Sequence, residues 1–320
     1  MGGAGRKRFQ QTLGGLLSTP YVGYFRACED TSVQRVVTAQ MDLELGASVD
    51  LILQLATAQG VPVSNESLTF TQGDRVYTPT EIVDQQGSRL HRLTGEPGRL
   101  EIRYEATVDG QAATGRTSDL EAITYLRPSR YAQSDEVFQQ ARRQFKGLSG
   151  HDLIAAVSEF VSTSTTYTPG LSHGTDSAVT TLMTGQGVCR DYAHVVIALL
   201  RAMDMPARYA ACYAPGLRPM DFHAVAEAYL DGAWYVIDAT RLANRSGLVR
   251  IATGRDAADC AFLSYYGGYV GLKRLRVDAW VMPDAVTLDG LDTLPGLTEE
   301  ALPPASDPSL DDFGALVQIA

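Results

Sequence analysis

The stretch Gly187-Val-Cys-Arg-Asp-Tyr-Ala-His194 joins a loop rich in Ser, Thr and Gly (residues 172–187) to a strongly apolar segment, residues 188–203. The apolar segment has the length and composition of a buried helix, so we expect Cys189 in its first turn. A helix N-terminus offers unpaired N–H groups and the positive end of the helix dipole, which favour a thiolate over a thiol. Cys189 is therefore a candidate nucleophile. The alternative is inert packing in a core, which is common for Cys.

A second segment predicts a β-hairpin that carries a base. An alternating run starts at His223, an Asp-Gly turn follows at 231–232, and a second run ends at Asp238. If Leu230 pairs with Ala233, His223 and Asp238 are diagonal neighbours on one face of the sheet, within side-chain reach. The carboxylate then orients the imidazole, whose other nitrogen faces the thiol, as in nucleophile–base–orienter triads. Taken singly, the histidine is also compatible with a core position and the aspartate with the start of a turn.

Five stretches together carry a family resemblance: 187–194, 197–209, Asp221-Phe-His-Ala, Tyr-Val-Ile-Asp-Ala-Thr at 235–240, and Ile251-Ala-Thr-Gly-Arg-Asp-Ala-Ala-Asp259. They resemble the bacterial transglutaminase-like family over about residues 150–280. The resemblance implies a papain-like core in which Cys189 attacks, His223 is the base and Asp238 orients it. Members often have Trp after the His-Ala pair, where this chain has Val225, a difference that bears on the substrate-facing wall. In this family the same triad serves proteolysis, amide hydrolysis, deamidation or transamidation, and some relatives are inactive.

The 320-residue chain is long enough for two domains. Strand patterns without helices between them predict an antiparallel β-sandwich, at 33–43, 49–57, 67–70, 80–84, 89–93 and 100–108. Helices are expected at 135–145 and 151–163. We therefore expect an α+β protein with four parts: an N-terminal extension (1–32), a β-rich domain (33–127) similar to the family's N-terminal region, a papain-like, transglutaminase-like catalytic domain (128–282), and an acidic, proline-containing tail (283–320). The tail is expected to be solvated, with an autoinhibitory strap or partner arm as the alternative.

Charge and hydropathy exclude several kinds of partner. The net charge of −10 argues against nucleic acid, since phosphate binding needs clustered Lys and Arg. No segment reaches the ~20 apolar residues of a membrane span, and residues 1–20 are too polar for an export signal. The predominance of Arg over Lys is typical of a GC-rich bacterial genome. We expect no membrane or nucleic-acid partner.

The four cysteines, at positions 28, 189, 212 and 260, show no paired metal-ligand spacing and no dense disulfide framework. A reducing, cytoplasmic compartment suits them best. Cys212 and Cys260 lie in apolar stretches and are expected to fill the core. No metal or cofactor is expected; a zinc site of Cys189, His194 and His223 has only a Cys-x4-His spacing in its favour.

These features predict a cysteine enzyme that acts on an amide or peptide bond of a peptide or protein through an acyl-enzyme intermediate. Hydrolysis, by a peptidase or amidase, is the default because water is always present. The alternatives are transamidation or deamidation of protein glutamine, and a non-catalytic peptide-binding module. The backbone N–H of Cys189 is the natural oxyanion donor, and Gln186 is a candidate side chain close in sequence.

Overall fold

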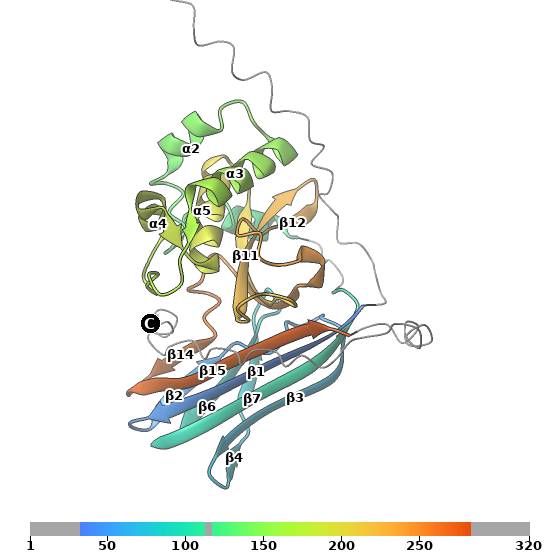
Figure 1. Ribbon diagram of the computed structural model, residues 1–320, viewed down its shortest axis with the longest axis vertical. Coiled ribbons are helices and arrows are strands. Elements are labelled where there is room, and N and C mark those ends of the chain that lie inside the picture. Colours follow the sequence, from blue (N-terminus) through green and yellow to red (C-terminus); the bar gives the residue numbers. More distant parts are fainter. Residues whose placement is uncertain (1–32, 113–116, 283–320) are drawn as a thin grey trace, which may run out of the picture.

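The computed structural model describes residues 33–112 and 117–282, and it combines helices with antiparallel sheets, as predicted (Figure 1). The expected N-terminal extension (1–32) and acidic tail (283–320) lie outside the described residues, as does Cys28. Within the described ranges, no helix is both long and apolar enough to cross a membrane.

Two antiparallel sheets form a sandwich, drawn below the helices in Figure 1. In spatial order, the first sheet contains β15 (Val270–Val281), β1 (Gln34–Leu45), β7 (Gly98–Asp109), β3 (Val63–Gln72) and β4 (Arg75–Tyr77). The second contains β14 (Leu263–Tyr266), β2 (Val49–Leu53), β6 (Arg89–Gly95) and β5 (Thr80–Val83). Every second side chain of β7 from Leu100 to Val108 is buried, which is the alternation that its sequence predicts. The sheets pack closely: a Cβ on Gly95 would lie 2.5 Å from Leu45 Cδ1.

Strands β14 and β15 come last among the described residues, yet they belong to the sandwich. Leu263 pairs with Leu53 of β2, and Val281 pairs with Arg35 of β1. The sequence-based division grouped both strands with the catalytic domain, because local periodicity does not reveal a distant pairing partner. The chain thus leaves the sandwich after β7, forms a second part that consists of helices and a further sheet, and returns to the sandwich at β14. The domain boundaries themselves stay a prediction.

The second part surrounds helix α5 (Cys189–Ala202), whose residues from Arg190 to Ala202 are all buried. It packs against α2 (Phe138–Gln144), α3 (Gly150–Ser164), α4 (Ala178–Thr184) and a sheet ordered β12 (Ala233–Ile237), β11 (Phe222–Leu230), β10 (Ala207–Tyr213) and β13 (Val249–Gly254). The smaller elements are α1 (Asp119–Thr124), β8 (Thr166–Tyr167), β9 (Gln186–Gly187) and a 3₁₀ turn at Arg245–Gly247. The expected helices at 135–145 and 151–163 are confirmed as α2 and α3, with ends shifted by a few residues.

Backbone and side-chain bonds join the sandwich to the second part. The Tyr213 hydroxyl on β10 donates to the Leu55 carbonyl (2.7 Å), and its ring stacks on that of Tyr104, with 6.2 Å between centroids. The Ala58 N–H donates to the Arg250 carbonyl at 2.9 Å. Since these groups are buried, the sheet that carries the hairpin is held against the sandwich.

Candidate active site

Cys189 is the first residue of α5, as the sequence predicted, and its side chain is partly exposed. The helix begins there because Asp191, in its first turn, accepts a hydrogen bond from the Val188 N–H (2.9 Å). The same carboxylate accepts a bond from the Ser172 hydroxyl at 2.5 Å. Asp191 therefore joins the start of the helix to the preceding loop and fixes the backbone at Cys189.

Gly187 and Arg190 complete this arrangement. A Cβ on Gly187 would lie 2.6 Å from the Cβ of Asp191, so a larger residue would push the capping carboxylate away. The buried Arg190 guanidinium donates to Asp191 at 2.9 Å and to the Ser172 hydroxyl at 3.1 Å. The charge of Asp191 is thus neutralised where the helix starts.

The β11–β12 hairpin has the predicted register. Leu230 pairs with Ala233, and Asp231 (φ 49°) and Gly232 (φ 82°) form the two-residue turn, both in the left-handed region that such turns require. This register brings His223 Nε2 to 3.0 Å from Asp238 Oδ2. The predicted diagonal contact is therefore confirmed. His223 is only 2% exposed, however, so the imidazole is more enclosed than a groove-facing side chain would be.

Asp238 is held by four donors. Its Oδ2 faces His223 and also accepts from the Ala243 N–H at 3.2 Å, while its Oδ1 accepts from the Thr240 N–H (3.1 Å) and hydroxyl (2.6 Å). Burial would raise the pKa of Asp238, but the hydrogen bond and charge of His223 and the other donors lower it. The group is therefore a fixed carboxylate at neutral pH, suited to orienting a histidine.

His223 lies between Asp238 and Cys189. Burial would lower the pKa of His223, but hydrogen bonds and charges of Asp238 and Cys189 outweigh it and raise the pKa to about 10. With Nε2 on the carboxylate, Nδ1 is left for the thiol; among the described residues it has no hydrogen-bond partner of ordinary geometry. The thiol–imidazole contact is thus looser than the imidazole–carboxylate bond, as in many unliganded sites. The raised pKa of His223 favours a protonated imidazole at neutral pH.

Two more groups lie beside this pair, and the sequence assigned neither of them a role. Tyr167 of β8 pairs with Gly187 of β9, two residues before Cys189, and burial raises the pKa of its hydroxyl. Asp221 accepts a bond from the Phe222 N–H (2.6 Å); burial raises its pKa to about 6, against the opposing effects of that bond and of His223. Asp221 could have been noted from its place in the Asp-Phe-His-Ala motif. Tyr167 carries no such local signal.

The other candidate residues serve the core. The His194 Nε2 accepts a hydrogen bond from the Ala257 N–H (3.2 Å), and its ring stacks on Tyr131 at 5.3 Å. Cys212 and Cys260 are buried, and burial raises the pKa of both thiols well above the ordinary value. The described part of the chain brings no three His, Cys, Asp or Glu side chains into a metal-binding group. Val225 packs in a small apolar cluster with Ala210 and Cys212.

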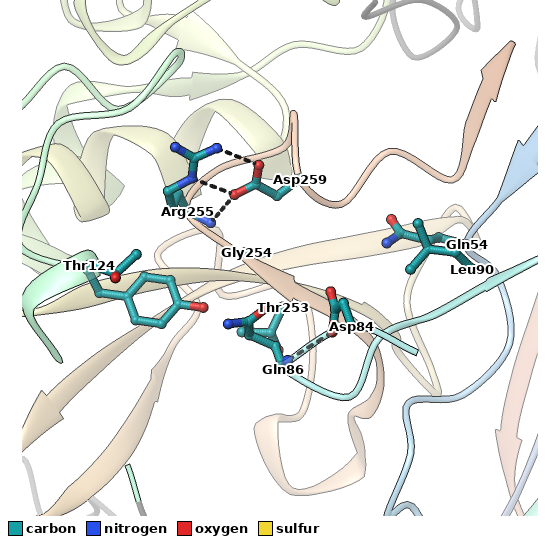
Figure 2. A pocket seen from close by; sticks show the side chains of 10 residues that line it. Gln54, Asp84, Gln86, Leu90, Thr124, Thr253, Gly254, Arg255 and Asp259 are labelled. Carbon is teal, nitrogen blue, oxygen red and sulfur yellow. Dashed lines mark hydrogen bonds and ion pairs between the residues drawn. The ribbon is translucent and has the colours of Figure 1, made fainter. Parts of the chain in front are cut away.

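A cavity of about 340 Å³ lies away from the triad, where the sandwich meets the second part. Figure 2 shows the lining residues Gln54, Asp84, Gln86 and Leu90 of the sandwich and Thr124, Thr253, Gly254, Arg255 and Asp259 of the second part. Its charged groups are already partnered: Arg255 with Asp259 at 2.9 Å, and Asp84 with the N–H groups of Gln86 (2.9 Å) and Ser88 (2.8 Å). These charged groups are therefore already engaged within the lining of the cavity.

Comparison with known proteins agrees with this fold. Residues 138–239 match the family model of the Transglutaminase-like superfamily, a range that contains Cys189, His223 and Asp238. A solved structure of a proposed cysteine protease from Cytophaga hutchinsonii is 32% identical, with 79% of this chain and 91% of that one covered and a TM-score of 0.72. An uncharacterized protein of Mycobacterium leprae is 26% identical over 165 residues, which are 49% of this chain and 58% of the relative. The chain thus spans less than two thirds of that relative's length.

The chain belongs to the transglutaminase-like superfamily. This fold class, shared with a proposed cysteine protease, supports a cysteine-based enzyme in general terms.

Proposed function

We propose that the protein is a cysteine hydrolase that cleaves an amide or peptide bond through an acyl-enzyme on Cys189. The observation that carries the proposal is the position of His223, bonded to Asp238 at 3.0 Å and next to the partly exposed thiol of Cys189. A module that only held a peptide would need neither a base nor an orienting carboxylate. Asp238 receives four hydrogen bonds in the one orientation that serves His223.

The proposed reaction starts from the thiolate–imidazolium pair. The sulfur of Cys189 attacks the substrate carbonyl carbon, a C–S bond forms, and the carbonyl π electrons move to the oxygen. As the C=O bond re-forms, the C–N bond breaks and the amine leaves with the proton from His223. Neutral His223 then takes a proton from water, whose oxygen attacks the thioester. The C–S bond then breaks and the carboxylic acid leaves, which restores the thiolate–imidazolium pair.

The substrate is proposed to be a peptide or protein, since a protein of similar fold is described as a protease. Hydrolysis is preferred because water is always present to resolve the acyl-enzyme. Transamidation and deamidation use the same acyl-enzyme, so they differ only in what resolves it. The cytoplasmic location expected from the cysteine content stays a prediction.

Cys189→Ala tests the proposal against a broad library of peptides and glutamine amides. We expect the wild-type protein to release acid and amine, and the variant to release neither. Cys212→Ala is the matched control, because that buried thiol should be dispensable for turnover. Activity retained by Cys189→Ala would overturn the proposal. A labelled primary amine added during turnover tests the reaction type, because its covalent incorporation in place of hydrolysis would identify a transamidase.

A further inference from the structure

Asp221 directly precedes β11 and lies two residues before His223, on the same face of the sheet. The ring of Phe222, between them, points the other way, because it packs on Tyr213 and Phe262 with 5.5 Å between ring centroids in each case. Successive side chains of an extended segment point to opposite faces, so Asp221 and His223 share the face opposite to Phe222. At the spacing of a strand, their Cα atoms are about 7 Å apart. The carboxylate thus lies one strand step beyond the imidazole.

Asp221 lies at the open end of this face. His223 is 2% exposed, whereas Asp221 and the thiol of Cys189 are both partly exposed. The electrostatics agree with this placement: burial raises the pKa of Tyr167, and the negative charges of Cys189 and Asp221 both raise it further. A substrate carbonyl at Cys189 would therefore have the Asp221 carboxylate among its neighbours.

In the described part of the chain, the Asp221 carboxylate has no lysine or arginine as an ion-pair partner. Its Oδ1 accepts the Phe222 N–H at 2.6 Å, and the imidazole of His223 is held by Asp238 at 3.0 Å. Burial raises the pKa of Asp221 to about 6, against the opposing effects of the Phe222 N–H and of His223, so the group is mainly ionised at pH 7. A carboxylate that is partly withdrawn from water and lacks a counter-ion favours a cation from a ligand.

Other carboxylates near the site show the contrast. Asp191 pairs with Arg190 at 2.9 Å, and Glu227 pairs with Arg208 at 2.7 Å. In both cases a side chain of the protein itself neutralises the enclosed negative charge. The charge of Asp221 is therefore left for a group from outside the chain.

We propose that Asp221 is a specificity-determining residue that binds an ammonium group of the substrate close to the scissile carbonyl. The inference rests on the proposed function of Cys189. The ammonium group would donate a charge-assisted hydrogen bond to the Asp221 carboxylate. Two parts of a peptide carry this chemistry, a lysine side chain and a free N-terminal amine. A neutral group at the same place leaves the carboxylate without a counter-charge, so such substrates should be disfavoured.

Three chloromethyl ketones of similar size test the inference, because each alkylates Cys189 by forming a C–S bond with loss of chloride. Acetyl-glycyl-norleucine chloromethyl ketone is the neutral reference. Acetyl-glycyl-lysine chloromethyl ketone adds a side-chain ammonium group, and glycyl-norleucine chloromethyl ketone has a free N-terminal amine. At pH 7, wild type should react about tenfold faster with at least one cationic probe than with the reference, as measured by mass spectrometry of the labelled peptide. In Asp221→Asn this ratio should fall to about one, and the probe whose ratio falls identifies the source of the ammonium group.

Asp231→Asn is the matched control. It removes one negative charge from the exposed turn of the same hairpin, where asparagine tolerates the φ of 49°. Its ratio should equal that of wild type.

Three results would overturn the inference: no preference of wild type for either cationic probe, an unchanged ratio in Asp221→Asn, or an equal fall in Asp231→Asn, which would attribute the preference to net charge. The reference probe separates this failure from that of the proposed function. If it labels Cys189 and the cationic probes are not preferred, only the role of Asp221 is wrong. If none of the three probes labels Cys189, the nucleophile itself is misassigned.

Discussion

Replacing Glu227 by glutamine should destabilise the sheet that carries His223. Glu227 lies on β11 and is 2% exposed. It accepts hydrogen bonds from Arg208 of β10 (2.7 Å) and Arg250 of β13 (2.9 Å), so one carboxylate ties three strands together. Burial would raise the pKa of Glu227, but the two guanidinium groups lower it to about 2. The glutamine variant keeps the shape of the side chain but removes the counter-charge of Arg250, while Arg208 keeps its ion pair with Glu121 at 2.8 Å.

The magnitude follows from that pKa. A fall from 4.5 to about 2 corresponds to about 3 kcal/mol of stability at neutral pH. The loss found when one partner of a buried ion pair is removed is similar, about 3–5 kcal/mol. Because the folded-state pKa is lowered, this stability is fully present above about pH 4.5 and is lost as the pH falls toward 2. At pH 3, the difference in stability between wild type and variant should be less than half of the difference at pH 7.

Urea unfolding at pH 7 and pH 3, followed by tryptophan fluorescence, measures both differences. Glu159→Gln is the matched control, since its ion pair with Arg241 is exposed and should contribute less than about 1 kcal/mol. A Glu227→Gln protein as stable as wild type at pH 7, or a difference that does not shrink at pH 3, would refute the reasoning.

Two other substitutions test the site and its support. Asp238→Asn should keep the far-UV circular dichroism spectrum and reduce turnover on the order of 10⁴-fold, because the amide favours the wrong imidazole tautomer; a loss below tenfold would contradict the orienting role. Burial lowers the pKa of His194 well below its ordinary value, so below about pH 6.5 only the unfolded chain binds a proton at this residue. The free energy of unfolding of the wild type should therefore fall as the pH drops below about 6.5, by up to about 1.4 kcal/mol per pH unit. In urea titrations at several pH values, the free energy of unfolding of His194→Gln should fall less steeply with decreasing pH than that of the wild type. Equal pH dependence in the two proteins would be inconsistent with a buried neutral histidine.

Local signals were enough to predict the elements that carry Cys189, His223 and Asp238. The helix at Cys189 and the hairpin from His223 to Asp238 each lie within one short segment, where apolar periodicity and the Asp-Gly turn specify the geometry. Because the turn fixes the register, the contact between His223 and Asp238 could be derived before any coordinates were known.

Distant pairings could not be derived in this way. Strand β15 alternates like any half-buried strand, and nothing in its sequence indicates that β1, at the other end of the described chain, is its partner. Tyr167 lies opposite Gly187, two residues before Cys189, only because β8 and β9 pair in parallel across the intervening loop and α4. The burial of His223 likewise depends on elements packed around the hairpin and not on the hairpin itself.

The most direct test of the account is the pH dependence of Cys189 alkylation by iodoacetamide, followed residue by residue by mass spectrometry. Because Cys189 is partly exposed and lies next to the protonated imidazole of His223, the account predicts that it is alkylated faster at pH 6–7 than the buried Cys212 and Cys260. In His223→Ala, alkylation at pH 6–7 should slow markedly and rise only toward alkaline pH. The account would be contradicted if wild-type Cys189 behaved like an ordinary thiol, with a rate that climbs through about pH 8.5 and is the same in the variant.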